Sequence, residues 1–155
     1  MKTLSIRMAT ASDIPQLGVL FDGYRQFYRQ PADTERARDF ISERLARGDS
    51  WILVAQQGDD QVGFCQLYPS FSSTHTSRIA ILNDLFVAAS VRKHGIAKAL
   101  MLAAEDLGRN LGMRALELST AIDNSTAQAL YESLDWQRDV EFYTDGVLVG
   151  TDVSF

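Results

Sequence analysis

Alternating and helically spaced apolar residues divide the first half of the chain into short elements. Residues 4–8 alternate apolar and polar side chains, which predicts a half-buried strand. Apolar residues recur at helical spacing from about residue 12 to 29 and again from 33 to 48, so two helices are expected. Residues 51–55 and 62–68 predict two antiparallel strands, because the segment between them reads as a hairpin turn.

The second half of the chain continues the alternation of strands and helices. The polar segment 70–76 predicts a loop or a frayed hairpin end, and 79–87 predicts a long apolar strand. A helix is expected over 96–111, a short strand over 115–118 and another helix over 124–134. Residues 136–143 and 147–153 predict a closing hairpin around Asp145-Gly146.

These elements give an α+β fold class. Strands outnumber helices and most neighbours are antiparallel, which favours a mixed, mostly antiparallel central sheet of about seven strands flanked by about four helices. At 155 residues, the chain is expected to form a single domain, 1–155.

Composition and charge exclude several classes of protein. A net charge of -5 argues against general nucleic-acid binding, which needs a basic surface. No apolar run is long enough for a membrane span, and the first residues read as a strand instead of a signal peptide. A cytoplasmic protein without a membrane partner is therefore expected. One cysteine and two histidines predict neither a disulfide nor a metal site.

A local reversal of charge marks a candidate anion site between residues 84 and 105. No acidic residue occurs between Asp84 and Glu105, and Arg92, Lys93 and Lys98 all fall there. A strand that enters a helix through a short turn directs the helix's free N–H groups and positive dipole end at that turn. The turn lacks both the P-loop pattern and Gly-x-Gly-x-x-Gly, so neither NTP hydrolysis nor dinucleotide binding is supported. Two simpler interpretations stay open. Gly95 could be an ordinary turn glycine, and the basic residues could form a merely solvated face.

Two motifs resemble the signatures of the GNAT superfamily of N-acyltransferases. Arg92-x-x-Gly95-x-Ala97 resembles its acyl-CoA-binding motif, Gln/Arg-x-x-Gly-x-Gly/Ala, and the segment 124–136 is similar to Asn-x-x-Ala-x-x-Leu-Tyr-x-x-x-Gly-Phe/Trp. The order of elements also matches that family along essentially the whole chain. Lys93, Ala97 and Asp135 depart from frequent glycines of the pattern; Asp135 tolerates a left-handed backbone better than most residues.

The resemblance implies the acyl-CoA N-acyltransferase fold and acetyl-CoA as cofactor. In the family, backbone N–H groups of the first motif hold the coenzyme A pyrophosphate, and Asn124 is expected to contact the pantetheine arm besides capping its helix. The residues assigned to the cofactor are Leu85, Phe86, Val87, Arg92, Lys93, His94, Gly95, Ile96, Ala97, Lys98, Asn124 and Ala127.

The resemblance also implies catalytic roles. The family's matching tyrosine gives a proton to the departing thiolate, which assigns Tyr131 as general acid, although its apolar stripe equally suits a core residue. Asp84 is assigned as the base or as the anchor for a cationic amine. The alternative for Asp84 is a structural carboxylate that caps backbone N–H groups. His75 or a water chain are other candidates for the base, and Cys65 is expected to be a buried apolar residue.

The predicted reaction is acetyl transfer to a small-molecule primary amine, such as a polyamine or amino acid derivative, directly in a ternary complex. Aromatic residues from segments that border the family's acceptor cleft, together with Asp22 and Asp84, suit a cationic amine. Two of these aromatic residues, Tyr24 and Tyr28, equally suit core packing. The aromatic residues are Tyr24, Tyr28, Tyr68, Phe71 and Tyr143.

The sequence leaves two alternative functions open and also predicts a homodimer. A non-catalytic acyl-CoA-binding sensor or interaction module and a protein or histone-tail lysine acetyltransferase both suit the same motifs. The apolar closing hairpin, with Phe142, Val147, Leu148 and Val149, predicts pairing across a two-fold axis and hence a homodimer.

Overall fold

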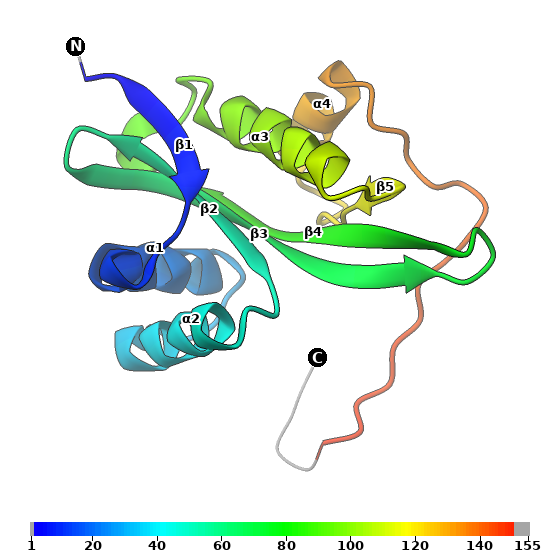
Figure 1. The fold of residues 1–155 in the computed structure, drawn as a ribbon, viewed down its shortest axis with the longest axis horizontal. Helices are drawn as coiled ribbons and strands as arrows, with labels where there is room; N and C mark the ends of the chain where they lie inside the picture. The colour runs from blue at the N-terminus through cyan, green and yellow to red at the C-terminus, as the bar shows by residue number, and fades with distance from the viewer. Residues whose placement is uncertain (1, 151–155) are drawn as a thin grey trace. The chain divides into compact units, whose positions relative to one another are not determined.

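The computed structural model describes residues 2–150, and the chain divides after Ser119 into two compact units that are described separately. The first unit holds a five-stranded sheet and three α-helices (Figure 1). Its strands are β1 (Leu4–Met8), β2 (Trp51–Gln57), β3 (Asp60–Ser72), β4 (Ser77–Val87) and β5 (Ala115–Glu117). Its helices are α1 (Ile14–Phe27), α2 (Thr34–Arg47) and α3 (Ile96–Asn110). The second unit contains α4 (Ser125–Ser133).

The sheet is mixed, as the sequence predicts. Its strand order is β1-β2-β3-β4-β5; the first four strands pair antiparallel, and β5 joins β4 in parallel. The α+β class and the four helices are confirmed for the described residues, whereas the strand count is five instead of about seven.

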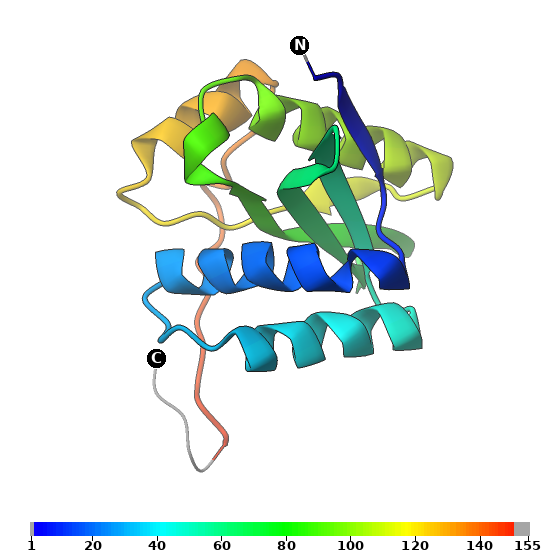
Figure 2. The same cartoon turned by 90° about the vertical axis from the view of Figure 1, so that its left-hand side faces the viewer.

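Two apolar cores lie on opposite faces of the sheet. α1 and α2 cover one face and α3 covers the other (Figure 2). Side chains alternate along β3 between the two faces: Phe64 packs with Leu17 and Ile41 of the helical pair, whereas Cys65 packs with Leu100 of α3. Because both faces are covered, the central strands read as nearly continuous apolar runs in the sequence.

The segment predicted as a loop or a frayed hairpin end, 70–76, is the end of the β3–β4 hairpin. β3 runs on to Ser72 and β4 begins at Ser77, so only residues 73–76 form the turn. The sequence reading underestimated the hairpin because cross-strand hydrogen bonds can extend a polar strand without a hydrophobic pattern. Pro69 is tolerated within β3 because β2 pairs with β3 only as far as Leu67.

The two predicted closing strands are not found among the described residues. Residues 136–150 contain no strand, and residues 151–153 of the second predicted strand lie outside the described part of the chain. Alternating apolar residues show which faces a strand would have, but they do not specify the partner that must hydrogen-bond to it. The homodimer expected from Phe142, Val147, Leu148 and Val149 therefore stays a prediction, as does the single domain.

None of the helices within residues 2–150 combines the length and the apolar character that a membrane crossing requires. The cytoplasmic location expected from the sequence stays a prediction.

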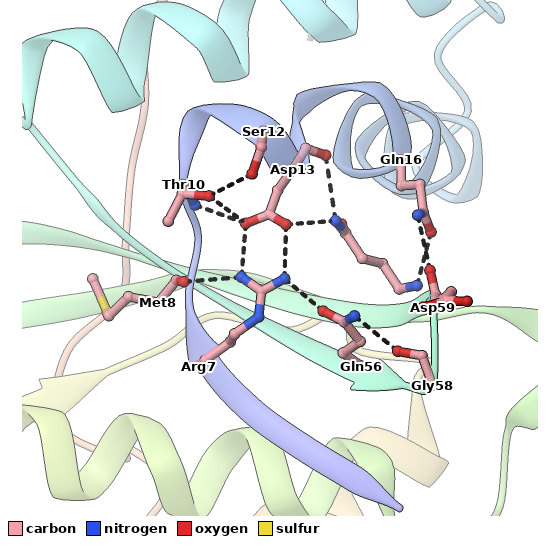
Figure 3. A network of polar contacts seen from close by, with 10 residues as sticks. Arg7, Met8, Thr10, Ser12, Asp13, Gln16, Gln56, Gly58 and Asp59 are labelled. Carbon is pink, nitrogen blue, oxygen red and sulfur yellow. Dashed lines mark hydrogen bonds and ion pairs between the residues drawn. The ribbon is translucent and has the colours of Figure 1, made fainter. Parts of the chain in front are cut away.

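A partly buried ion pair ties β1 to the start of α1 (Figure 3). The Arg7 guanidinium donates two hydrogen bonds to the Asp13 carboxylate, both at 2.8 Å, and Asp13 also accepts from the Thr10 N–H at 2.7 Å and from Gln61 Nε2 at 2.9 Å. The hydrogen bond from Arg7 lowers the pKa of Asp13 to about 2, against the opposing effect of burial. Residues from β1, the α1 entry and β3 are thereby held together by one carboxylate.

This network predicts a pH-dependent loss of stability in Asp13→Asn. Because the pKa of Asp13 is lower in the folded chain than its ordinary value of 3.8, its stabilisation is complete above that value and disappears as the pH falls through about 2. Urea unfolding should show the variant less stable by on the order of 2 kcal/mol at pH 7, with the difference vanishing near pH 2.

A matched control is Asp60→Asn, which removes a charge from an exposed pair with Lys2. That change should cost less than about 1 kcal/mol at either pH. An equal loss for Asp13→Asn at pH 7 and pH 2 would mean that the carboxylate charge is not what stabilises the α1 entry.

Candidate functional site

A β-bulge in β4 determines which face of the sheet Asp84 occupies. Leu82 pairs with Leu67 and Asp84 with Gln66, so Asn83 is an extra residue opposite β3. Leu82 belongs to the core beneath α3, and simple alternation would send Asp84 to that same face. The extra residue reverses the alternation and places Asp84 with Phe86 on the face that α1 covers.

Asp84 is a buried carboxylate held by neutral donors. It is 2% exposed; Gln66 Nε2 donates to its Oδ2 at 2.6 Å and Asn83 Nδ2 to its Oδ1 at 2.7 Å. Burial raises the pKa of Asp84, although these hydrogen bonds and the Tyr24 hydroxyl oppose the shift. Among residues 2–150, no ion pair includes Asp84. The site therefore supplies a buried acceptor of protons or of a cation without a counter-ion of its own.

Three of the predicted acceptor aromatics gather around this carboxylate. The Tyr24 hydroxyl donates to the Asn83 carbonyl at 3.1 Å, and the Tyr24 and Tyr28 rings pack edge to face at 5.1 Å. The charge of Asp84 acts on Tyr28 and Tyr68, because it adds to burial in raising the pKa of both hydroxyls. Helix α1 approaches β4 closely at Gly23, where an added Cβ would lie 3.0 Å from Phe86 Cε2.

Asp22, the other carboxylate expected near the acceptor, is already neutralised. It is buried, and Arg25 Nη1 donates to it at 2.6 Å. Gln26 Nε2 and the Asp33 N–H also donate to Asp22, so this residue secures the connection between α1 and α2. Asp84 differs from Asp22 in lacking a cation, which makes Asp84 the carboxylate suited to an incoming amine.

The remaining predicted acceptor and base residues lie apart from this cluster or in the second unit. Phe71 is 74% exposed, and it lies three residues beyond Tyr68 on β3, so the two side chains point to opposite faces. His75 lies in the exposed β3–β4 turn, where its Nδ1 is 3.0 Å from the Ser72 hydroxyl. Tyr143 belongs to the second unit, in its segment without strands. The roles of these three residues stay predictions.

One edge of β4 lacks a strand partner within the first unit. β5 pairs with β4 only from Ile79 to Ile81, and no strand of that unit continues the pairing along residues 82–87. Backbone N–H and C=O groups on such an edge are available to an extended ligand with amide groups. Leu85, Phe86 and Val87, which the sequence assigns to the cofactor, lie on this segment, and their contacts with a cofactor stay predictions.

The turn after β4 presents free backbone amides. Ala99 makes the first helical hydrogen bond of α3, to the Gly95 carbonyl, and no side chain caps the helix. The N–H groups of Ile96, Ala97 and Lys98 consequently have no acceptor within the helix. Gly95 has φ +77°, a left-handed conformation that favours glycine, and the space where a Cβ would stand is open. These amides have the geometry that an anion requires, and the anion site predicted from the sequence stays a prediction.

The basic side chains near these amides differ in their contacts. Arg92 turns back onto β4, where its Nε donates to the Val87 carbonyl at 3.0 Å and its guanidinium lies over the Phe86 ring. Lys93, His94 and Lys98 are exposed. Lys93 has φ +70° at a position where the family often has glycine, a conformation that costs a lysine about 1 kcal/mol. Their contacts with a cofactor stay predictions.

The second unit contains the other sequence signature. The Asn124 side chain caps α4 by accepting from the Ala127 N–H at 3.1 Å, which is its expected structural role. Tyr131 packs against Trp136, with ring centroids 6.3 Å apart. Asp135 has φ +65°, so it does adopt the left-handed backbone that the usual glycine would supply.

Sequence analysis missed Gln66 and Ser50. The Ser50 hydroxyl donates to Gln66 Oε1 at 2.8 Å, and Gln66 in turn donates to Asp84, which joins the three residues in one hydrogen-bonded chain. Gln66 carried a signal, since it is a polar residue inside a buried apolar strand, as Asp84 is.

Comparison with known proteins places this arrangement among acetyltransferases. The profile of the acetyltransferase (GNAT) family matches residues 17–136. The chain is 41% identical over 139 residues to the uncharacterized N-acetyltransferase YhfO of Bacillus subtilis (strain 168), covering 90% of this chain and 93% of YhfO.

Solved structures of acetyltransferases resemble this chain as well. The crystal structure of a probable acetyltransferase superposes with a TM-score of 0.88 at 36% identity, covering 96% of this chain and 99% of that one. An aminoglycoside N-acetyltransferase in complex with CoA shares the fold, with a TM-score of 0.76 at 21% identity over 94% of this chain and 96% of that one.

The burial of Cys65 predicts an unreactive thiol. Cys65 is fully buried, and burial together with the charge of Asp84 raises the pKa of its thiol to about 12. A disulfide reagent such as DTNB should label almost none of the native protein at pH 8 and one thiol per chain in guanidinium. Fast labelling of the native protein would instead indicate an accessible thiolate that could carry an acyl group.

Proposed function

Because the chain belongs to the GNAT family of acetyltransferases, and is thereby an acetyl-CoA-dependent N-acetyltransferase, we propose that its acceptor is a small-molecule primary amine acetylated directly in a ternary complex. The observation that carries the proposal is the buried Asp84 carboxylate, which lacks a protein cation among the described residues and is surrounded by Tyr24, Tyr28 and Tyr68.

Acetyl-CoA supplies an acetyl thioester and an anionic pyrophosphate. The free amides of Ile96, Ala97 and Lys98 suit the pyrophosphate, and the unpaired edge of β4 at Leu85–Val87 suits the amide groups of pantetheine. Gly95 leaves open the space through which the phosphates approach. Arg92, Lys93, His94 and Lys98 add basic side chains around these amides, and Asn124 and Ala127 are the second unit's assigned contacts.

Asp84 is proposed to hold the amine and accept its proton. An alkyl ammonium of pKa about 10 must lose a proton before its nitrogen can attack a thioester. The carboxylate first pairs with the ammonium and then takes one of its protons, directly or through a water. The neutral nitrogen can then attack the thioester carbonyl, so that the N–C bond forms and the C–S bond breaks. Burial supports this role because it raises the pKa of Asp84 and so makes the carboxylate a better base.

Tyr131 is proposed to give a proton to the sulfur that leaves. The support is the sequence signature around it, in which Asn124, Ala127, Leu130, Tyr131 and Trp136 occupy the matching positions. The ammonium loses two protons in all. Asp84 takes one before the nitrogen attacks, and the second leaves the nitrogen as the C–S bond breaks and replaces the proton that the Tyr131 hydroxyl gives to the thiolate. The products are the neutral amide, the coenzyme A thiol and one proton held by Asp84.

The aromatic and acidic surroundings of Asp84 favour a compact cationic amine. Tyrosine rings and a carboxylate bind ammonium groups through cation–π and ionic contacts. The aminoglycoside N-acetyltransferase that shares the fold acts, by its name, on a small molecule. A protein or peptide lysine is the second candidate acceptor, and a non-catalytic acyl-CoA sensor is the alternative that the family assignment makes less suitable.

The proposal is tested by assaying a panel of amines with the wild-type enzyme and then with the Asp84→Asn variant. Free-thiol release from acetyl-CoA should increase with one or more polyamines, amino acids or aminoglycosides. Asp84→Asn should lower kcat/KM for that amine by about 10²- to 10⁴-fold, the usual contribution of a general base, while acetyl-CoA affinity is kept.

The control is Asp106→Asn, which removes an exposed carboxylate on α3 and should leave the rate unchanged. Stimulation by peptides alone would identify a protein acceptor. If no amine accelerates thiol release although acetyl-CoA raises the Tm, the sensor alternative replaces the proposed function.

Tyr131→Phe tests the proton donor. The variant keeps the ring that packs on Trp136 and loses only the hydroxyl. We expect kcat to fall at least about tenfold, with acetyl-CoA affinity unchanged, because only the protonation of sulfur is impaired. An unchanged kcat would leave Tyr131 as a packing residue of the α4 apolar stripe.

A further inference from the structure

Gln66 is a fully buried amide that connects Asp84 to a residue at the end of α2. It is 0% exposed and lies in the buried part of β3, directly opposite Asp84 in the strand register. Its Nε2 donates to Asp84 Oδ2 at 2.6 Å, and its Oε1 accepts from the Ser50 hydroxyl at 2.8 Å. Both ends of the amide therefore have a partner of the appropriate kind.

The Ser50 hydroxyl supports the orientation of the Gln66 amide in which the NH₂ group meets Asp84. A carboxamide has an accepting oxygen and a donating NH₂ group, and rotation by a half turn exchanges them. When the Ser50 hydroxyl donates to the oxygen, the NH₂ group must face the carboxylate. Ser50 is itself held between α2 and β2, because Arg44 Nε pairs with the neighbouring Asp49 at 2.9 Å and Trp51 begins the pairing of β2 with β3.

The orientation of Gln66 favours the charged form of Asp84. A donated N–H stabilises an ionised carboxylate, whereas a facing carbonyl oxygen would require a protonated one. With Asn83 Nδ2 on the other oxygen, each oxygen of Asp84 accepts from a neutral amide. The remaining acceptor capacity of the carboxylate is left for a ligand.

We propose that Ser50 and Gln66 are positioning residues, which hold Asp84 ionised and oriented so that it can accept the proton of the bound amine. The inference rests on the proposed function, because it concerns how the base of that reaction, Asp84, is held. Neither residue touches the reacting atoms; Ser50 acts through Gln66, and Gln66 acts through Asp84.

The other titratable groups around Asp84 do not obscure its titration. Tyr24 in α1, Tyr28 just after it and Tyr68 in β3 lie on the Asp84 side of the sheet, and Cys65 in β3 lies on the opposite side; burial raises the pKa of all four. Burial is the main reason that the pKa of Tyr68 rises to about 12, with Asp84 and Asp49 adding to the shift and Arg44 opposing it. The fall of kcat/KM at low pH, its acid limb, should therefore report the pKa of Asp84 in the free enzyme.

The experiment compares this acid limb in four variants with that of the wild-type enzyme, using the best amine of the panel. Ser50→Ala releases the Gln66 oxygen, and Gln66→Met removes the donor at similar volume. Both should move the limb upward by about half a pH unit or more, so that kcat/KM below it falls about threefold or more.

Two variants are controls. Ser50→Thr keeps the hydroxyl and should restore the wild-type limb. Ser77→Ala makes the same chemical change at a buried β4 hydroxyl that has no hydrogen-bond partner in the described residues, and it should not move the limb.

The outcomes separate this inference from the proposed function. If Asp84→Asn removes the limb while Ser50→Ala and Gln66→Met leave it in place, the positioning role is overturned and Asp84 remains the base. If Asp84→Asn keeps a wild-type limb, both assignments fail. A uniform loss of rate in Ser50→Ala and Gln66→Met, without a shift of the limb, would show that the pair only supports packing and would overturn the inference.

Discussion

The arrangement of the first unit depends on a buried carboxylate that has no cation beside it among the described residues. Burying a charge is costly unless hydrogen bonds or an opposite charge offset the lost hydration. Asp84 receives amide donors from Gln66 and Asn83 and lies beside Tyr24, yet burial still raises its pKa. The β4 bulge, the close approach of α1 at Gly23 and the polar residue inside β3 all serve the environment of this one group. Such an environment is unfavourable for folding and favourable for binding and deprotonating an amine, which suggests why a stable core contains it.

The two ends of the β4 region have opposite electrostatic character. At Asp84 the strand offers a negative side chain to the α1 face, whereas the turn beyond Val87 offers backbone N–H groups and basic side chains. A cationic acceptor and an anionic cofactor would therefore be drawn to different places along the same strand and the turn that follows it. Between these places, the unpaired edge of β4 has backbone groups for an extended ligand. This separation of charge suits the proposed transfer of an acetyl group from acetyl-CoA to a cationic amine.

Much of the fold could be predicted from local patterns, because apolar periodicity reports how a segment is buried. The strand 4–8 and the helix from residue 96 agree closely with β1 and α3, and the turn before α3 has the uncapped amides that the predicted anion site needs. Features that depend on distant partners were not predictable in the same way. The bulge at Asn83 is a matter of register between β3 and β4, and the pairing of Gln66 with Ser50 depends on how β3 packs beside the segment that precedes β2. The closing strands were expected from alternation alone, which carries no information about a partner strand.

The most direct test of the account is a crystal structure of the enzyme with a conjugate that joins coenzyme A to its best acceptor amine. The acceptor's nitrogen is predicted to lie within hydrogen-bond distance of an Asp84 carboxylate oxygen, directly or through one water, with the tyrosines of α1 and β3 around the acceptor. The pyrophosphate is predicted to contact the amides of residues 96–98. A conjugate bound through its phosphates, with its acceptor far from Asp84 and that carboxylate contacted only by Gln66 and Asn83, would contradict the account.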